Sequence, residues 1–217
     1  MIKAISFDVG ETIVDETREY GTWADWLDVP RHTFSAVFGA AVGRGGDYRE
    51  AFQVFRPGFD LTAERQKRAE AGQAETFTEK DLYPDVRPAL GSLAVMGVKT
   101  GLAGNQTEGA EAILRSLNLP VESIGTSASW GVEKPSIAFF KRIATAMGCD
   151  PAEILYVGDR LDNDIAPAQQ AGMLTALIKR GPWGYILDSP ASERCLFRID
   201  SLLELPSLVE DYNSTVN

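Results

Sequence analysis

The sequence predicts an α/β protein whose parallel sheet carries helices on both faces. Three observations predict it. Short apolar runs alternate with helical patterns of about ten residues through the second half of the chain. Glycine or acidic residues stop these runs. Residues 15–81 interrupt the alternation with helical spacing alone. We therefore expect a three-layer, Rossmann-like core, formed by residues 1–14 and 82–217, with a small inserted α-helical domain, residues 15–81.

The composition is that of a soluble globular protein. The chain has 217 residues, which suffice for one sizeable domain or for a core with a smaller insertion. It is 44% hydrophobic and 24% charged, and no run approaches the ~20 apolar residues that span a bilayer. Residues 1–4 lead into the first apolar run without a signal region, so a cytoplasmic location is expected.

Charge and cysteine content narrow the possible ligands. A net charge of −10 argues against nucleic acid and against an anionic membrane surface as partners. It leaves a small anionic substrate, because a few local positive groups or a divalent cation are enough to bind one. Cys149 and Cys195 are far apart, and His32 is the single histidine, so neither a disulfide framework nor a zinc site is expected. Any metal should be held by oxygen.

The first strand is expected to end at Asp8, because the apolar run Ile5 to Phe7 delivers this carboxylate and Gly10 follows in a tight turn. On these residues alone, an aspartate that merely starts a turn is an equally good interpretation. In the insertion, Trp23, Trp26 and Leu27 have i, i+3, i+4 spacing, which predicts amphipathic helices. Residues 63–74 are charged and predict a solvated helix or a mobile surface segment.

The core elements follow in regular order. Asp85 can cap a helix that Gly97 ends, and Gly148 lies past the end of a stronger helix. The tail, residues 213–217, is expected to be loose. The predicted elements after residue 82 are helix 85–96, strand 98–103, helix 108–117, a short strand at Ile124, helix 136–147, strand 154–157, helix 165–171, strand 174–178 and strand 196–199.

Chemically active side chains follow four of these elements. They are Asp8, the pair Gly104 and Asn105, Lys134, and the acidic segment 158–164. Because parallel strands present their carboxyl ends at one edge, these residues are expected to converge. Asp8, Asp159 and Asp164 would place three carboxylates together, which favours Mg²⁺ as a counter-ion. Taken singly, Lys134 could be a surface lysine and Asp164 a helix N-cap.

These motifs resemble those of the haloacid dehalogenase superfamily of hydrolases, over nearly the whole chain. The family has a strand ending in Asp-x-Asp-Gly-Thr, a second ending in Ser or Thr, a Lys, and an acidic Gly-Asp segment. They correspond here to residues 8–12, Gly104, Lys134 and residues 158–164. The segment 15–81 lies where one subfamily carries a helical cap between its first and second motifs.

The resemblance implies an Mg²⁺-dependent phosphatase of a small phosphorylated metabolite, monomeric or homodimeric. Asp8 would be the nucleophile that forms an aspartyl-phosphate. Asp8, the Gly10 carbonyl, Asp159 and Asp164 would hold or orient the metal. Lys134 would offset negative charge and, together with Gly104 and Asn105, bind the phosphoryl group. In the cap, one or two arginines that face the core would recognise an anionic substrate. The residues available there are Trp23, Trp26, Arg31, His32, Arg44, Tyr48, Arg49 and Arg56.

Two positions depart from the family pattern. Gly10 stands where phosphatases carry a second Asp, which acts as general acid and base. Glu11 is a candidate substitute, although consecutive residues of an extended chain point to opposite faces. Gly104 lacks the usual hydroxyl, which leaves its backbone N–H. The pattern therefore predicts a phosphatase with weakened acid–base function.

Two alternatives remain open. The chain could be a catalytically weak member that binds a phosphorylated ligand or a protein partner. It could be a 2-haloacid dehalogenase, since these carry a non-acidic residue at the Gly10 position, although they lack the acidic fourth motif. Phosphonate hydrolases of the superfamily also lack the second Asp, but they use a cap lysine, and the cap lysines here, Lys67 and Lys80, both lie in polar surroundings that favour a solvated role.

Overall fold

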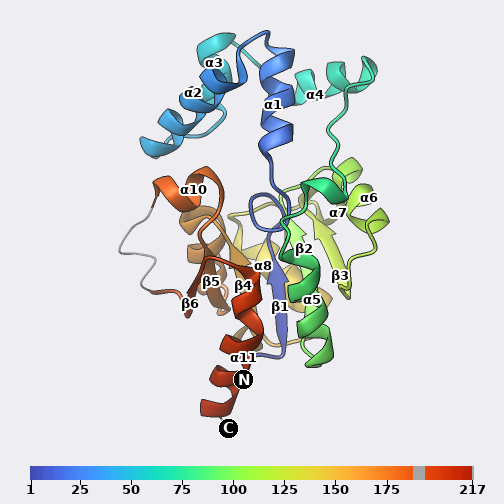
Figure 1. Cartoon of the computed structure of the whole chain (residues 1–217), viewed down its shortest axis with the longest axis vertical. Coiled ribbons are helices and arrows are strands. Elements are labelled where there is room, and N and C mark those ends of the chain that lie inside the picture. The colour runs from blue at the N-terminus through green and yellow to red at the C-terminus, as the bar shows by residue number, and fades with distance from the viewer. Residues whose placement is uncertain (188–193, 217) are drawn as a thin grey trace.

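The computed structural model describes residues 1–187 and 194–216. Within them, six strands form one parallel sheet in the order β3-β2-β1-β4-β5-β6. Because β1 and β4 lie in the centre, the segments that follow them meet at the middle of one sheet edge (Figure 1). The strands are β1 (Ala4–Phe7), β2 (Lys99–Gly104), β3 (Ser123–Thr126), β4 (Ile154–Gly158), β5 (Leu174–Ile178) and β6 (Phe197–Ile199).

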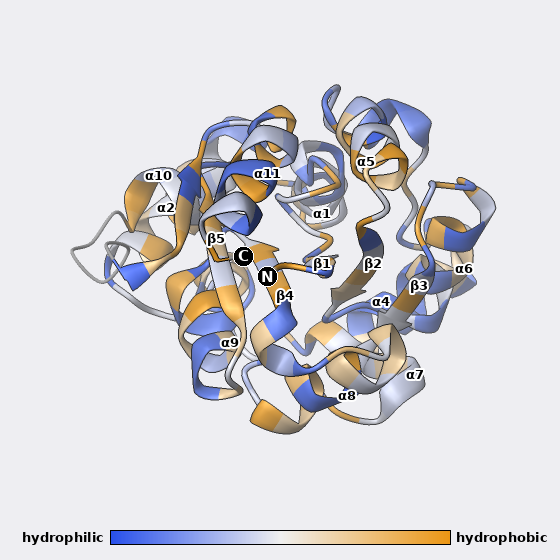
Figure 2. Cartoon of the chain, turned by 90° about the horizontal axis from the view of Figure 1, so that it is seen from below, coloured by the Kyte–Doolittle hydropathy of each residue, from blue (hydrophilic) through white to orange (hydrophobic). Residues whose placement is uncertain are grey.

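Helices cover both faces of this sheet, which confirms the predicted three-layer α/β core (Figure 2). One face carries α5 (Val86–Val95), α6 (Glu108–Ser116) and α11 (Leu205–Thr215). The other carries α8 (Ile137–Met147) and α9 (Ala166–Gln170). The shorter helices α7 (Ser127–Trp130) and α10 (Gly181–Ile186) lie after β3 and β5.

The central strands are buried on both sides, so their sequences are largely unbroken runs of apolar residues. In β4, Leu155 and Val157 belong to one apolar cluster, whereas Ile154 and Tyr156 belong to the other. This alternation is the period of two expected of a strand between two helical layers. The short runs of the sequence therefore identified each strand to within about two residues, the usual uncertainty of such boundaries.

Three helices were not predicted, and one segment differs from its prediction. Helices α7 and α10 are too short to show a long apolar stripe in the sequence. Helix α11 lies close to the end of the chain. The predicted helix 165–171 begins earlier, as a π-helical turn η3 (Leu161–Ile165) that runs into α9. The tail is also not loose up to Thr215, since the Asn213 side chain accepts a hydrogen bond from Ile2 N–H at 2.6 Å and donates one to Ile2 O at 2.9 Å.

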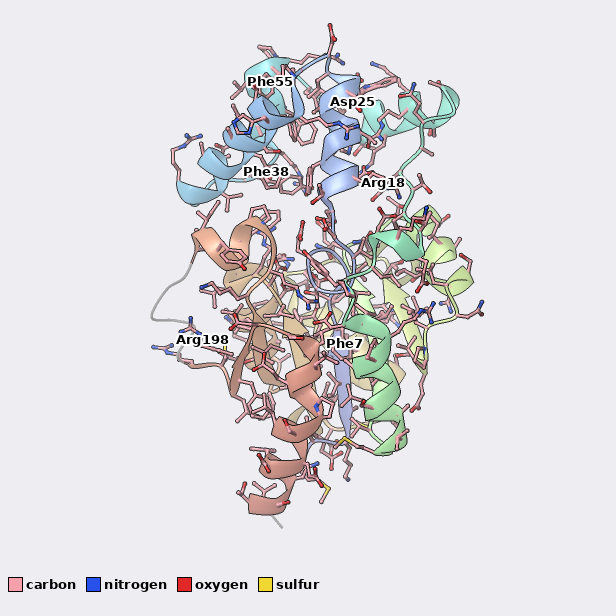
Figure 3. The ribbon with its side chains drawn as sticks, viewed as in Figure 1. Phe7, Arg18, Asp25, Phe38, Phe55 and Arg198 are labelled. Carbon is pink, nitrogen blue, oxygen red and sulfur yellow. The ribbon has the colours of Figure 1, made fainter. Side chains whose placement is uncertain are left out.

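Four helices form the inserted segment above the sheet (Figure 1). They are α1 (Thr17–Trp26), α2 (Arg31–Gly43), α3 (Glu50–Phe55) and α4 (Leu61–Glu70), called the cap helices below. Their aromatic side chains, Phe38 and Phe55 among them (Figure 3), gather in an apolar cluster of their own. Within it, Phe34 and Phe52 pack edge to face. Trp183 of α10 joins this cluster against Phe38, at 5.3 Å between ring centroids. The core therefore contributes one aromatic residue to the cap. The division at residues 14/15 and 81/82 stays a prediction.

The expectation of a solvated segment at residues 63–74 is wrong for two side chains of α4. Arg68 is 3% exposed and its guanidinium lies 4.0 Å from the Trp23 ring centroid. Glu64 is 7% exposed and accepts a hydrogen bond from Trp26 Nε1 at 2.7 Å. These charges are buried because the aromatic rings of α1 offer them a π-face and an N–H donor, which the local sequence does not reveal.

Two chain crossings join the cap helices to the core, and they run side by side. Asp15 N–H donates to Asp81 O at 2.8 Å, and Tyr83 N–H donates to Ile13 O at 3.1 Å. Arg18, at the lower end of α1 (Figure 3), forms a bidentate pair with Asp81, at 2.8 and 2.6 Å. That pair lowers the pKa of Asp81 to about 2. The two crossings therefore hold the start of α1 at a defined place above β1.

Asp85 occupies the predicted N-cap position of α5, but its side chain does not cap the helix. Its Oδ2 instead accepts hydrogen bonds from the buried Arg180 guanidinium, from Ser201 Oγ at 2.7 Å and from Leu202 N–H at 2.9 Å. Arg180 also donates to Thr12 O at 2.8 Å. Asp85 therefore ties β5 and the segment after β6 to the start of α5.

Replacing Asp85 with alanine is expected to destabilise the fold by about 3–5 kcal/mol, because it leaves the Arg180 guanidinium buried without a counter-charge. Urea unfolding of the two proteins measures this difference. Glu122→Ala, at an exposed position, serves as the control and should change stability by less than about 0.5 kcal/mol. Equal unfolding free energies for wild type and Asp85→Ala would contradict the assignment.

Candidate active site

A cavity of about 950 Å³ lies between the cap helices and the carboxyl edge of the sheet. The core side of its wall includes Asp8, Asn105, Lys134 and Asp159. The cap side includes Tyr20, Tyr48, Arg49, Arg65 and Glu75. All four strand-end segments predicted from the sequence therefore reach one cavity.

Across the described residues, no helix has the length and apolar character that a bilayer crossing requires.

Asp8 follows β1 directly and is 7% exposed, so most of it is buried while it still reaches the cavity. Its backbone N–H donates to Val157 O of β4 at 2.8 Å, which fixes it to the sheet. The chain then turns sharply, because Ile13 and Val14 N–H both donate to Val9 O at 2.9 Å. Glu11 takes a left-handed conformation in this turn, with φ of 52°. The turn is the loop seen above β1 (Figure 1).

Lys134 is 3% exposed, so a surface position is wrong for it. Its Nζ lies 2.6 Å from Asp8 Oδ1 and 2.6 Å from Asp164 Oδ1. Burial alone lowers the pKa of Lys134, but the carboxylates of Asp164 and Asp8 raise it above its usual value. The ammonium group therefore stays charged between the two carboxylates.

Asn105 acts on Lys134 through the backbone. Its Nδ2 donates to Lys134 O at 2.9 Å, and its Oδ1 accepts from Lys134 N–H at 2.8 Å. Both ends of the amide thus hold the lysine, whereas the sequence suggested that Asn105 contacts the substrate. Asn105 still lines the cavity, so its role towards a phosphoryl group stays a prediction.

The carboxylates of Asp8, Asp159 and Asp164 form an acidic cluster. One ligand atom from each lies within 4.8 Å of the others, and all three residues are buried. Burial, together with the charges of Asp164 and Asp8, raises the pKa of Asp159 well above its ordinary value. Burial raises the pKa of Asp164 to about 6. A divalent cation would favour the ionised form of these groups.

The acidic cluster fits a hard cation in a further respect. Asp159 Oδ2 is buried and has no hydrogen-bond partner among the described residues. A buried carboxylate oxygen without a partner loses the stabilisation that water gave it, and a cation supplies the missing interaction. Asp164 differs, because its Oδ1 accepts from Lys134 and its Oδ2 accepts from Arg160 N–H at 3.1 Å. It is therefore better suited to orient its neighbours than to be the principal ligand.

Two glycines permit this crowding. A Cβ on Gly158 would lie 2.6 Å from the Asp164 carboxyl carbon, so η3 could not turn back over the end of β4 with a larger residue there. A Cβ on Gly104 would lie 2.8 Å from Asp8 Oδ1. With Asp8 in this place, residue 104 has little room for a side chain, and therefore for a hydroxyl.

Glu11 and Glu16 both bring carboxylates near Gly10. Glu11 is 6% exposed, and its Oε2 accepts a hydrogen bond from the Tyr83 hydroxyl at 2.6 Å. Burial raises its pKa, and the bond from Tyr83 partly opposes the change. Glu16 is half-buried and lines the same cavity, and burial with the nearby charges of Glu11 and Asp8 raises its pKa well above the ordinary value. Sequence reasoning missed Glu16, because nothing in the spacing places it beside Gly10.

Some of the cap residues named from the sequence line the cavity, and others lie away from it. Of the eight named from the sequence, Tyr48 and Arg49 line the cavity. Trp23 is 2% exposed inside the cap cluster, as its helical spacing predicted, and His32 is exposed on α2. Cavity residues that were not among the predicted site residues include Tyr20, Arg65 and Glu75 from the insertion, and Arg160 and Trp183 from the core. Of the core pair, Arg160 lies 4.6 Å from the Trp183 ring centroid. Neither Lys67 nor Lys80 lines the cavity.

The chain is similar in sequence and in fold to known proteins. A family model described as haloacid dehalogenase-like hydrolase matches residues 2–172. A glyceraldehyde 3-phosphate phosphatase from Methanopyrus kandleri is 37% identical over 134 residues, which cover 59% of this chain but only 57% of that relative. One from Pyrococcus abyssi is 31% identical over 198 residues, or 83% of each chain. The crystal structure of a β-phosphoglucomutase from Clostridium difficile covers 100% of this chain and 99% of its own, with a TM-score of 0.69 at 18% identity. At that identity the likeness shows the fold alone.

Proposed function

The chain belongs to the haloacid dehalogenase-like hydrolase family, and we propose that it is an Mg²⁺-dependent phosphatase of a small phosphorylated metabolite. One observation carries the proposal. The Lys134 ammonium bridges Asp8 and Asp164 at 2.6 Å each, beside the unpartnered Asp159 Oδ2, at the wall of a cavity. This arrangement pairs a fixed carboxylate nucleophile with a fixed positive charge.

The relatives support the substrate class. Two of them are named glyceraldehyde 3-phosphate phosphatase, although the first is matched over little more than half of its length. A cavity of about 950 Å³ is within the usual range for a small-molecule site. Arg49 and Arg160 lie in its wall, where their positive charge favours an anionic group of a metabolite. Arg160 also donates to Asp162 through Nε at 3.1 Å and Nη2 at 2.8 Å.

The metal would be held by Asp8, Asp159 and the backbone carbonyl of Gly10, with Asp164 orienting them. When bound, Mg²⁺ would neutralise negative charge on the phosphoryl group. Gly10 lines the same cavity as Asp8. A backbone carbonyl does not depend on the side chain, so a glycine at residue 10 can still supply this ligand.

The protein's own groups then divide the reaction into two displacements. Asp8 attacks phosphorus and forms an aspartyl-phosphate as the ester bond breaks. Lys134, held by Asn105, offsets negative charge on Asp8 and on the transferring group. Water then cleaves the acyl phosphate and restores the Asp8 carboxylate. Residues of the insertion, among them Tyr20 and Arg65, line the same cavity as Asp8.

A panel of phosphoesters, assayed for phosphate release with Mg²⁺ and again with excess EDTA, tests the proposal. We expect hydrolysis of at least one small alkyl phosphate and its loss in EDTA. The two rival functions give other outcomes. Halide release from 2-chloropropionate without added metal would identify a dehalogenase, and binding of phosphoesters without any turnover would identify a binding protein.

A further inference from the structure

In an ordinary phosphatase of the family, the residue at the Gly10 position carries the general acid and base. In this chain, the carboxylate of Glu16 occupies the space where that side chain would lie. A Cβ built on Gly10 would lie 2.5 Å from Glu16 Oε1, 2.8 Å from its Cδ and 3.1 Å from Oε2. Contacts under about 3 Å are too short for real Cβ atoms, so a side chain on residue 10 and Glu16 in this place exclude each other.

We propose that Glu16 is the general acid and base of this hydrolase, supplied from the start of the cap in place of the aspartate that Gly10 lacks. The inference rests on the proposed phosphatase function and adds a catalytic residue to it. Glu16 is the residue just before α1, and its side chain lines the cavity that Asp8 also lines.

The chain around Glu16 is built so that this side chain can return over Gly10. The left-handed Glu11 reverses the backbone, and Glu11 N–H donates to Val14 O at 2.8 Å. Asp15 N–H is then fixed to Asp81 O, and the Glu16 carbonyl accepts Tyr20 N–H at 3.0 Å as the first turn of α1. Both ends of the short segment are therefore anchored, and Glu16 lies between them.

Glu16 also has the freedom that a proton-transferring group needs. Within the described residues, no hydrogen bond is found to its carboxylate. Glu11 lacks that freedom, because Tyr83 donates to it at 2.6 Å and a Cβ on Gly181 would lie only 2.5 Å from Glu11 Cγ. Glu75 faces Arg65 at 3.9 Å. Of the three glutamates at this end of the cavity, Glu16 is the one that replaces a side chain on Gly10.

The proposed reaction consists of two displacements at phosphorus. In the first, an Asp8 oxygen forms a bond to phosphorus while the bond from phosphorus to the ester oxygen breaks. The ester oxygen keeps the electron pair and takes the proton of the Glu16 carboxyl group, so the alcohol leaves neutral.

In the second displacement, the Glu16 carboxylate removes a proton from water as the water oxygen attacks phosphorus. The bond from phosphorus to the Asp8 oxygen breaks, and its electron pair restores the Asp8 carboxylate. Inorganic phosphate leaves, and Glu16 is again protonated. No additional co-reactant is needed.

The decisive measurement compares Glu16→Gln with wild type on two substrates. One is the alkyl phosphate hydrolysed fastest in the panel, and the other is p-nitrophenyl phosphate, whose leaving group needs little protonation. We expect kcat/KM for the alkyl ester to fall by about 10²–10⁴ and that for the aryl ester to fall far less. A purely structural role would lower both equally, and that result, or no loss at all, overturns the proposal.

Two sets of variants sharpen the test. Glu11→Gln is the matched control, and a selective loss on alkyl esters there instead of in Glu16→Gln assigns the role to Glu11 and overturns the proposal. Gly10→Asp combined with Glu16→Ala should exceed Glu16→Ala alone on the alkyl ester, by at least about 10-fold, because the acid returns. Failure of wild type on every phosphoester would instead reject the phosphatase function itself.

Discussion

Asp8→Asn is expected to reduce phosphate release to the background rate. The substitution keeps the size of the side chain, and the backbone bond from residue 8 to Val157 is untouched. The amide cannot form the acyl phosphate, because its oxygen is a poor nucleophile and its nitrogen has no free electron pair for attack. Since the proposed reaction begins with this bond, no later group can compensate.

The measurement is the steady-state rate with Mg²⁺ on the best substrate of the panel, together with acid quenching of the enzyme after mixing with ³²P-labelled substrate. Wild type should carry label on Asp8, and Asp8→Asn should carry none. Asp211→Asn, an exposed position on α11, controls for the general effect of the change and should match wild type. Turnover by Asp8→Asn equal to wild type would exclude the aspartyl-phosphate.

Lys134→Met should have the second largest effect. Methionine fills a similar volume but leaves Asp8 and Asp164 facing each other without the ammonium group that now lies 2.6 Å from both. Loss of one such preorganised electrostatic group lowers kcat by about 10²–10³. Removing one partner of a buried ion pair also destabilises a fold by about 3–5 kcal/mol. We therefore expect loss of both activity and stability.

Separate measurements distinguish the two effects of Lys134→Met. Urea unfolding gives the stability difference, and kcat is measured at a temperature where the variant is fully folded. Lys141→Met, exposed on α8, is the matched control and should change neither quantity appreciably. If Lys134→Met retained the wild-type kcat while folded, Lys134 would be structural, and the charge-offsetting role would be withdrawn.

The sequence contained enough information to predict the core and the meeting of Asp8, Lys134, Asp159 and Asp164. Strand spacing and the apolar runs are local properties, and a parallel sheet necessarily places its carboxyl ends at one edge. The order β2-β1-β4 then puts the first and fourth motifs on neighbouring strands. Asp8 and Asp159 directly follow β1 and β4, Asp164 lies in η3 just after β4, and Lys134 follows α7 by a short loop, so their positions depend mainly on the order of the core elements.

The tertiary structure was needed for residues whose partners lie far away in the sequence. Asp85 has the sequence of a helix cap, yet its partner Arg180 is on the far side of the sheet order, after β5. Trp183 belongs to a core helix but packs in the cap. Their environments arise from packing between segments, and local propensity does not describe such packing.

Glu16 is the clearest case. The sequence shows that the aspartate expected at residue 10 is missing, and one-dimensional reasoning looks to the adjacent Glu11 for a replacement. The left-handed turn at Glu11 commits that side chain to Tyr83 and returns the chain so that a glutamate six positions beyond Gly10 covers it. The pattern of residues determined the fold, the position of Asp8 at the end of β1 and the lack of a carboxylate on residue 10. Only the folded turn decided which carboxylate lies beside Gly10. A flexible side chain on a loop takes its direction from the backbone angles and the contacts around it.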